Sequence, residues 1–449
     1  MARGKKKENL SLEEKLERAL VPVEEQPYEV PGNWCWVKLN AISEIYTGNS
    51  INERIKREKY LYQPEGLDFI ATKDVEFDNS IVYNNGVKIN DYDKFKVAPE
   101  NTSLLCIEGG SAGRKLGFTK EKVCFGNKLC AFVSKGCVSK YIYYYLQSNV
   151  FYSQFIKQRH GLIGGVSVKD LSGFLIPVAT LSEQQRIVER IERMFAKLDE
   201  ARDNVTEIKK TYLARKAAIL SKAFTGELTL AWRNQNNICD SWSEKTFGEV
   251  AMIESNLVEP NEYQDFPHIA PDNIEKRTGV LLSYNTIAED GVTSGKHRFY
   301  PGQILYSKIR PYLSKVVTVD FDGLCSADMY PIETKENTRY LWYYMLSDEF
   351  LRQASSAGSR SVLPKINRKE LSEILVNIPS AEEQEEVVKI LDRILPYEQK
   401  VVEYAKGILE QINVMKKTIL SKAFCGELGT NNPAEESAIE LLKTMLVET

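Results

Sequence analysis

The chain has 449 residues, of which 43% are hydrophobic and 27% are charged, and its formal net charge is −3. This length supports two or three domains, and the balanced charge excludes a chain that is basic throughout, so any nucleic-acid surface must be local. No apolar run reaches the roughly 18 residues of a membrane span, and the cysteines form no CxxC pair. We therefore expect a cytoplasmic protein without a membrane segment, a structural zinc site or a disulfide framework.

Two mixed segments alternate with two long charged segments along the chain. In chain order the sequence predicts a tail with a short helix at 1–34, an α/β globule at 35–178, a long helix at 179–228, a linker at 229–242, a second α/β globule at 243–378, a second long helix at 379–428 and a tail at 429–449. Within the first globule, Val123–Ser134 has the β-branched and aromatic residues of strands. Lys140–Ile156 has the apolar spacing of a helix. We assign the tyrosines of YIYYYL at 141–146, and of YLWYYML at 340–346 in the second globule, to the core rather than to base stacking.

A repeated decapeptide links the two halves of the chain. The stretch ILSKAFTGEL at Ile219–Leu228 recurs as ILSKAFCGEL at Ile419–Leu428, about 200 residues later. Matches continue backwards into both globules, where KYIYYYLQSNVF at Lys140–Phe151 aligns with RYLWYYMLSDEF at Arg339–Phe350. The chain is thus a tandem duplication of one module, and two similar modules usually relate by an approximate two-fold axis.

Each long charged segment carries an apolar seam whose spacing alternates between four and three residues, as in a coiled coil. The seam residues are Ile187, Ile191, Met194, Leu198, Ala201, Val205, Ile208, Tyr212 and Ile219 in the first copy, and Val387, Leu391, Ile394, Val401, Ala405, Ile408, Ile412, Met415 and Ile419 in the second. Only Arg215 and Glu398 break the seams, and Pro396 should kink or interrupt the second helix. The seams predict two helices packed on each other, antiparallel if a two-fold axis relates the modules. Each helix lying on its own globule is the alternative.

The arrangement of these segments resembles the specificity subunit of a type I restriction-modification system. The resemblance rests on two α/β globules followed by LSEQQRIVERIE and AEEQEEVVKILD, and on the repeated decapeptide. The opening LVPVEEQPYEVPGNWCWVKLNAI is also similar to the beginning of the first target recognition domain in that family. The resemblance implies an α+β fold, a tandem duplication of an α/β target recognition domain plus a long helix. The two helices would form an antiparallel coiled coil with a pseudo-two-fold axis.

The same resemblance implies a function and a set of partners. Each globule would read one half of a bipartite site in double-stranded DNA, and the helices would set the spacing and dock two methyltransferase subunits. S-adenosylmethionine would be bound by the methyltransferase partner, and ATP and Mg by two restriction subunits, whose presence the sequence leaves open. The residues expected on the spacer and partner-binding helices are Glu183, Gln184, Ile187, Ile191, Leu198, Lys222, Phe224, Glu383, Gln384, Leu391, Lys422 and Phe424.

A rival hypothesis is a single-chain DNA methyltransferase or nuclease. The nearest string to an (N/D)PP(Y/F) loop, NNPAE at 431–435, lacks the second proline and the aromatic residue. GGSAGRK and GVTSGK do not fit the phosphate-loop pattern, and no strand is followed by GxGxxG. The three histidines, at 160, 268 and 297, form no metal-ligand motif. We therefore predict no catalytic residue, no metal site and no cofactor in this chain.

Local segments favour DNA more than the global charge does. Residues 291–319 contain no Asp or Glu, and neither do residues 109–120 at the corresponding place in the first module. A Gly- and Ser-rich basic loop also precedes each long helix, at 158–171 and 356–371. Such segments can neutralise phosphates and read bases. The predicted DNA-binding residues are Arg114, Lys115, Lys120, Arg159, Lys169, Lys296, Arg298, Lys308, Arg310, Lys315, Arg360 and Lys365.

Two of these residues receive distinct roles. Arg310 precedes Pro311, which limits the local backbone, so we predict that Arg310 reads a guanine while Lys315 contacts phosphate only. A solvated basic strand, a turn with a helix cap, or an Arg310 paired with a carboxylate are the alternatives left open. For the whole chain, the alternative is a non-catalytic coiled-coil adaptor with two protein-binding globules. The sequence does not specify which bases are read or how far apart the half-sites lie.

Overall fold

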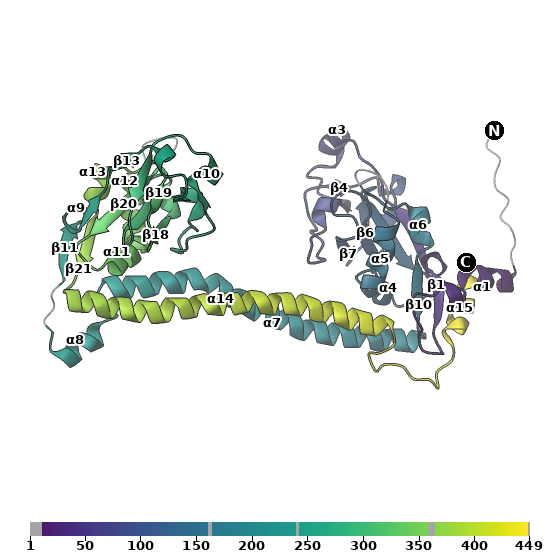
Figure 1. Cartoon of the computed structure of the whole chain (residues 1–449). Helices are drawn as coiled ribbons and strands as arrows, with labels where there is room; N and C mark the ends of the chain where they lie inside the picture. Colours follow the sequence, from purple (N-terminus) through teal and green to yellow (C-terminus); the bar gives the residue numbers. More distant parts are fainter. Residues whose placement is uncertain (1–10, 160–163, 239–241, 358–363, 448–449) are drawn as a thin grey trace. The chain divides into compact units, whose positions relative to one another are not determined.

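The computed structural model describes residues 11–159, 164–238, 242–357 and 364–447. Contacts divide the chain into unit 1, residues 1–203 with 408–449, and unit 2, residues 204–407. Each unit holds one α/β globule together with half of each of two long helices (Figure 1). The units differ from the consecutive ranges expected from the sequence, because each unit contains one part of α7 (Leu181–Phe224) and one part of α14 (Ala381–Phe424).

The first globule is built around two small sheets and a strand pair. Strands β1 (Cys35–Lys38) and β10 (Leu175–Val178), at its two ends, pair antiparallel. One four-stranded sheet has the order β2 (Ser43–Thr47), β9 (Leu129–Ser134), β6 (Ser103–Cys106), β7 (Leu116–Phe118). The other has the order β4 (Lys88–Ile89), β3 (Leu67–Ile70), β8 (Val123–Phe125), β5 (Val97–Ala98).

The second globule repeats this plan. Strands β11 (Ser243–Thr246) and β21 (Leu375–Ile378) pair at its two ends. A four-stranded sheet has the order β12 (Ala251–Ile253), β20 (Met329–Thr334), β17 (Ile304–Ser307), β18 (Val316–Thr318). A five-stranded sheet has the order β13 (Leu257–Val258), β16 (Lys296–Phe299), β19 (Gly323–Cys325), β14 (Pro267–Ile269), β15 (Asn285–Thr286).

Each unit also contains short helices. In unit 1 they are α1 (Leu12–Ala19), α2 (Leu39–Ile42), α3 (Glu53–Ile55), α4 (Ser139–Tyr145), α5 (Asn149–Lys157), α6 (Val168–Ser172) and α15 (Ala438–Val447). In unit 2 they are α8 (Leu230–Asn236), α9 (Phe247–Val250), α10 (Ile287–Asp290), α11 (Thr338–Met345), α12 (Asp348–Ala357) and α13 (Arg368–Ser372). Tyr141 of α4 and Tyr340 of α11 are buried, and their hydroxyls donate to the carbonyls of Pro177 and Asn377 at 2.8 and 2.7 Å. The assignment of these tyrosines to the core is confirmed.

The long helices α7 (Leu181–Phe224) and α14 (Ala381–Phe424) pair antiparallel within each unit. In unit 1 the start of α7 shares a core with the end of α14, and Lys416 Nζ lies 2.7 Å from Asp199 Oδ1. In unit 2 the end of α7 shares a core with the start of α14, which includes Leu391. Both cores also contain globule side chains, so each helix packs on its globule as well as on the other helix. The two packing modes expected as alternatives therefore coexist.

Two details of the helix prediction need correction. Pro396 does not interrupt α14, which is continuous over 44 residues. Packing of the neighbouring Leu391 and Leu395 into the unit 2 core offsets the lost backbone hydrogen bond. Near the unit boundary, Ile408 and Met415 of the predicted seam are exposed, whereas Ala405 and Ile412 stay buried.

Candidate nucleic-acid interface

In each globule the two basic segments expected to contact DNA meet side by side. In unit 2 the Arg310 N–H donates to the Pro364 carbonyl at 2.7 Å, and the Ile366 N–H donates to the Lys308 carbonyl at 2.9 Å. We name this contact, between residues 308–310 and 364–366, the loop bridge of unit 2. It brings together segments that lie about 55 residues apart in the sequence, one of which connects β17 to β18.

Unit 1 has the same loop bridge. The Gly109 N–H donates to the Gly164 carbonyl at 3.2 Å, and the Val166 N–H donates to the Ile107 carbonyl at 3.1 Å. The first of these loops connects β6 to β7, as its counterpart in unit 2 connects β17 to β18. The backbone contact is the same in both globules, but the side chains on it differ. The two loop bridges therefore have the same geometry and different charges and hydrogen-bonding groups.

The loop bridge of unit 2 carries a cluster of cations. Lys308 Nζ donates to the Ala327 carbonyl at 2.6 Å and lies 5.4 Å from the centre of the Tyr330 ring. Arg368 lies over the same ring at 5.7 Å, and Lys365 Nζ lies 3.3 Å from Asp328 Oδ1. Burial lowers the pKa of Lys308, and the charges of Lys365 and Arg368 lower it further against the opposing effect of Asp328. A bound anion would relieve this repulsion, as a DNA phosphate does.

Arg310 projects from a strained backbone. Its φ and ψ are 49° and 59°, the left-handed region, which costs a residue with a side chain on the order of 1–3 kcal/mol. Pro311 follows it and begins a short 3₁₀ helix, and the backbone N–H of Arg310 is fixed by Pro364. Its side chain is exposed. An exposed cation held on a fixed turn is suited to direct contact with nucleic acid.

Two predicted lysines turn inward at equivalent positions. Lys315 Nζ donates to the Pro271 carbonyl at 2.7 Å and lies 3.3 Å from Asp272 Oδ1. Lys115 Nζ donates to the Thr72 carbonyl at 3.3 Å. Lys115 thus connects the loop after β6 to the 3₁₀ segment Thr72–Asp74 that follows β3. Lys315 connects the loop after β17 to the 3₁₀ segment Pro271–Asn273 that follows β14. This internal role explains why the two lysines recur in both modules.

Of the remaining predicted residues, Arg159 lies against Gly164 of the unit 1 loop bridge, and the other described ones lie elsewhere on the globules. In unit 1, Arg114, Lys120, Arg159 and Lys169 are exposed, and the Arg114 guanidinium lies 5.8 Å from the centre of the exposed Phe77 ring. The unit 1 loop bridge itself carries Glu108, which pairs with Lys128 at 3.5 Å, so it is less cationic than that of unit 2. Lys296 is buried, its Nζ donates to Ser294 at 2.8 Å, and burial lowers its pKa. Arg298 lies among the rings of Tyr263, Phe266 and Tyr300. Arg360 lies outside the described residues.

Arg368, a basic residue of the loop before α14, is also a member of the cluster. Its Nη2 donates to the Glu254 carbonyl at 2.8 Å. Arg368 also lowers the pKa of the buried His297, after the larger effect of burial and together with Lys308. It lies in the first turn of α13, within the basic loop 356–371 that the sequence pattern singles out.

The repeated glutamates of the long helices form internal junctions. Glu183, buried at the start of α7, accepts from Trp34 Nε1 at 2.8 Å and from Asn431 Nδ2 at 2.9 Å. Glu383, buried at the start of α14, accepts from Trp242 Nε1 at 3.1 Å and from Arg233 and Thr229. Each junction ties the start of one long helix to the strand entering its globule and to the segment that follows the other long helix.

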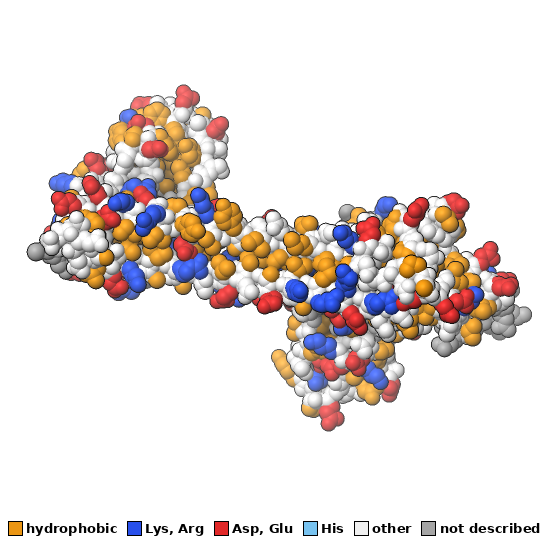
Figure 2. Space-filling view, turned by 90° about the horizontal axis from the view of Figure 1, so that it is seen from below, with side chains coloured by type: hydrophobic (Ala, Val, Ile, Leu, Met, Phe, Trp, Pro, Cys, Tyr) orange, Lys and Arg blue, Asp and Glu red, His pale blue; other side chains and the backbone are white. Residues whose placement is uncertain are grey.

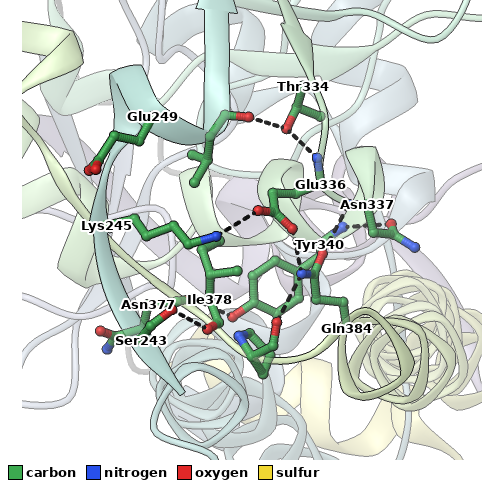
Figure 3. A network of polar contacts seen from close by, with 12 residues as sticks. Ser243, Lys245, Glu249, Thr334, Glu336, Asn337, Tyr340, Asn377, Ile378 and Gln384 are labelled. Atoms are coloured by element: carbon green, nitrogen blue, oxygen red, sulfur yellow. Dashed lines mark hydrogen bonds and ion pairs between the residues drawn. The ribbon is translucent and has the colours of Figure 1, made fainter. Parts of the chain in front are cut away.

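The repeated glutamines fasten each long helix to its globule. Figure 3 shows Gln384 of α14 beside the turn before α11: its Oε1 accepts from the Asn337 N–H at 2.9 Å, and its Nε2 donates to Glu336 Oε2 at 2.8 Å. Lys245 of β11 pairs with the other oxygen of Glu336 at 3.1 Å. Gln184 accepts in the same way from the Val138 N–H at 2.9 Å.

The other predicted helix residues divide into buried and exposed groups. Buried in the cores are Ile187, Ile191, Phe224, Leu391 and Phe424; Leu198 is half-buried; Lys222 and Lys422 are exposed. Figure 2 shows hydrophobic side chains along the long helices on the face that it presents. Exposed apolar residues of these helices include Tyr397 and Tyr404, at 71% and 70%, in unit 2 and Val414, at 63%, in unit 1. These residues lie outside the predicted seam, so apolar residues at non-seam positions of a long helix are the sequence signal that would have identified them.

The described residues contain no group of three His, Cys, Asp or Glu side chains placed to hold a metal ion. Over the same residues, no helix is both long enough and apolar enough to cross a membrane.

Comparison with known proteins identifies relatives over most of the chain. A family model described as "Type I restriction modification DNA specificity domain" matches residues 31–209 and again residues 239–413. The chain is 40% identical over 309 residues to the type I restriction enzyme EcoDI specificity subunit of Escherichia coli, covering 62% of this chain and 70% of that protein. It is 21% identical over 440 residues to the StySPI specificity subunit of Salmonella potsdam, covering 91% of this chain and 92% of that protein.

Solved structures share the fold. A chain from a structure titled "Structural basis underlying complex assembly and conformational transition of the type I R-M system" matches with a TM-score of 0.70 and 16% identity, over 89% of this chain and 100% of that one. The HsdS subunit from Thermoanaerobacter tengcongensis matches with a TM-score of 0.57 and 17% identity, over 90% of this chain and 100% of that one.

Proposed function

Because the chain belongs to the type I restriction-modification DNA specificity family, with two copies of its domain in tandem, we propose that each globule reads one half of a bipartite DNA site. The observation that carries the proposal is the repeated loop bridge. The same backbone contact recurs in both globules, with Lys308, Lys365 and Arg310 around it in unit 2 but Glu108 in unit 1. Equivalent platforms with different side chains suit two globules that read different sequences.

The reading of DNA combines two kinds of contact. Cations around the loop bridge neutralise phosphates and fix the position of the globule on the duplex, and this contribution weakens as salt rises. We expect Arg310, exposed on a fixed turn, to pair with O6 and N7 of a guanine. The specificity chain itself performs no chemistry and binds no cofactor, so its contribution to catalysis is to place a partner enzyme on the correct sequence.

The helices serve as the docking surface for that partner. Each unit combines the start of one long helix with the end of the other, so one chain offers two similar helical surfaces, with exposed residues such as Tyr397 and Val414. We propose that two methyltransferase subunits bind there and supply S-adenosylmethionine. Restriction subunits, where present, supply ATP and Mg. The buried Glu183 and Gln184 act inside the chain, so the partner contacts other side chains.

The test uses the complete complex. Co-expressed with its methyltransferase, the chain should purify as one specificity chain with two methyltransferase chains, measured by native mass spectrometry. Methylated bases mapped in the host genome should form a two-part motif with a fixed gap. Replacing residues 40–175 by the corresponding globule of a relative should change one half-site only. A stable one-to-one complex at saturating methyltransferase, or an uninterrupted motif, would contradict the proposal.

A further inference from the structure

A row of polar side chains crosses the five-stranded sheet of the second globule. The strand register places Arg298 opposite Leu324, Leu324 opposite His268, and His268 opposite Asn285. Asn256, just before β13, continues the row beyond Arg298, whose N–H donates to the Asn256 carbonyl at 3.3 Å. Residues directly opposite one another in a sheet lie on the same face. Four of these five residues are therefore polar on one face of one sheet.

Three atoms of this row are buried without a hydrogen-bond partner among the described residues: Asn256 Oδ1, Arg298 Nε and His268 Nε2. The carboxylate nearest to Arg298 is that of Asp322, whose Oδ1 lies 4.0 Å from Nη2, beyond hydrogen-bond distance. His268 is held on its other side by Asp290, which lies 2.6 Å from Nδ1. Buried polar atoms in proteins are nearly always paired, so an unpaired set concentrated in one row indicates a site that a ligand completes.

Aromatic rings surround the guanidinium of Arg298. Its guanidinium carbon lies 4.9, 5.4 and 5.8 Å from the centres of the Tyr300, Tyr263 and Phe266 rings. These rings hold the guanidinium through cation–π contacts, and its side chain is 31% exposed. An arginine positioned in this way loses little freedom when it binds.

The first globule shows that the fold does not require a polar row. Its equivalent strands place Val97 opposite Cys124 and Cys124 opposite Phe69, whose N–H donates to the carbonyl of Val87. All four residues are apolar, and Phe69, Val87 and Cys124 are buried in one hydrophobic cluster with Tyr60. The shared fold therefore does not need polar residues in this row, and their presence is specific to the second globule.

We infer that Arg298 and Asn256 read one G·C base pair in the half-site of the second globule, an inference that rests on the proposed function. A phosphate offers only acceptors, so it would pair with Arg298 and with Nδ2 of Asn256 but would leave Oδ1 of Asn256 without a donor. The major-groove edge of a G·C pair offers both kinds of group: O6 and N7 of guanine accept, and N4 of cytosine donates. Arg298 Nε and Nη2 donate to the guanine, and Asn256 Oδ1 accepts from the cytosine, each after a change of rotamer that exposes the buried atom; such changes are common at interfaces.

The test compares Arg298→Lys and Asn256→Ala in the complex with the methyltransferase. Arg298→Lys keeps the charge but loses the planar fork that matches guanine. Both variants should make the same single G·C position of the second half-site degenerate in methylation maps. Competition binding to DNA changed at that position should show discrimination falling about tenfold to hundredfold. The first half-site serves as an internal control and should stay unchanged.

Other results overturn the inference in distinguishable ways. An unaltered motif with lower affinity for every sequence would assign Arg298 to phosphate, and an unaltered motif with unaltered affinity would assign it no contact. If the two variants made two different positions degenerate, Arg298 and Asn256 would not read the same base pair. A wild-type complex without a two-part motif would instead overturn the proposed function. Thermal unfolding of each variant checks the fold, and Asn256→Ala decides the question alone if Arg298→Lys is unstable.

Discussion

Arg215 and Glu398, the residues that interrupt the apolar seams of α7 and α14, bind each other: Nε and Nη2 of Arg215 both donate to Oε2 of Glu398, at 3.0 and 2.8 Å. The polar residue that interrupts the seam of α7 thus pairs with the polar residue that interrupts the seam of α14. Their side chains are 35% and 21% exposed, so the pair is half-buried. A single polar pair inside an apolar helix interface penalises any sliding of one helix past the other, because a shift would leave both groups unpaired.

This pair predicts a double-mutant cycle. Arg215→Leu or Glu398→Leu alone should lower the free energy of unfolding by about 1 kcal/mol, because each leaves a half-buried charge without its partner. The double variant Arg215→Leu/Glu398→Leu should recover most of this loss by completing the apolar seam. Urea unfolding of the four proteins gives the coupling energy, which we expect at about 2 kcal/mol. Additive losses in the double variant would show that the pair contributes nothing beyond its separate residues.

The junction at Glu383 predicts a sharp contrast between neighbours. Glu383→Ala should destabilise unit 2 by about 3 kcal/mol or more, because it leaves the largely buried Arg233 and the Trp242 N–H without their acceptor. Glu382→Ala is the matched control, since Glu382 is exposed at the adjacent position of the same helix. Thermal unfolding should separate the two variants clearly. Equal melting temperatures would refute the structural role of the junction.

The loop bridge of unit 2 predicts a separation of base reading from phosphate binding. Arg310→Ala should relax one base position in the second half-site, at about 1–3 kcal/mol of lost discrimination. Lys365→Ala should lower affinity for all sequences alike and reduce the slope of log K against log salt by about 1. Methylation maps and binding at several salt concentrations measure both effects. A normal motif in the Arg310→Ala strain would remove its base-reading role.

Lys315 serves as the comparison for this experiment. Its Nζ is occupied by the Pro271 carbonyl, so Lys315→Ala should lower the melting temperature rather than the salt slope. If the slope of log K against log salt fell in Lys315→Ala as it does in Lys365→Ala, Lys315 would be a phosphate contact.

Lys216 predicts a pH-dependent stability. This side chain is buried on α7, its Nζ donates to the Arg277 carbonyl at 2.8 Å, and burial lowers its pKa to about 8. Between pH 8 and about 10.5 the unfolded state therefore binds more protons at this residue than the folded state, so its contribution favours folding increasingly as pH rises. The gain at the top of this window is up to about 3 kcal/mol.

Lys216→Met isolates this effect from other groups that titrate in the same window. The difference in unfolding free energy between Lys216→Met and the wild type should be largest near pH 7, in favour of the variant, and should shrink toward pH 10. Lys416→Met is the control at the equivalent position of α14, where Nζ pairs with Asp199. A difference that is constant with pH would mean that Lys216 titrates normally.

Much of the fold followed from repetition and periodicity in the sequence. The duplication, the two long helices and their antiparallel pairing were predictable because apolar spacing reports directly on helix faces. Repetition could not distinguish internal from external contacts. Glu183 and Glu383 recur in both copies because each copy contains the same internal junction, so recurrence gave no reason to place them on a partner surface.

The site was less predictable, because it depends on contacts between distant segments. Charge patterning correctly singled out loops that meet in space, but it could not show that Lys315 turns toward the Pro271 carbonyl. The row that joins Asn256, Arg298 and His268 comes from strands far apart in the chain. Only the register of the sheet places these three residues on one face, and a linear pattern contains no such information.

The way the units are divided has a consequence for how the chain is synthesised. Unit 2 is one continuous stretch, whereas unit 1 needs residues 408–449 to complete its helix pair and to supply Asn431 to the Glu183 junction. On the ribosome, the second globule therefore has all its parts before the first one does. A premature stop codon just after residue 407 would leave the C-terminal globule whole and deprive the N-terminal globule of its supporting helix.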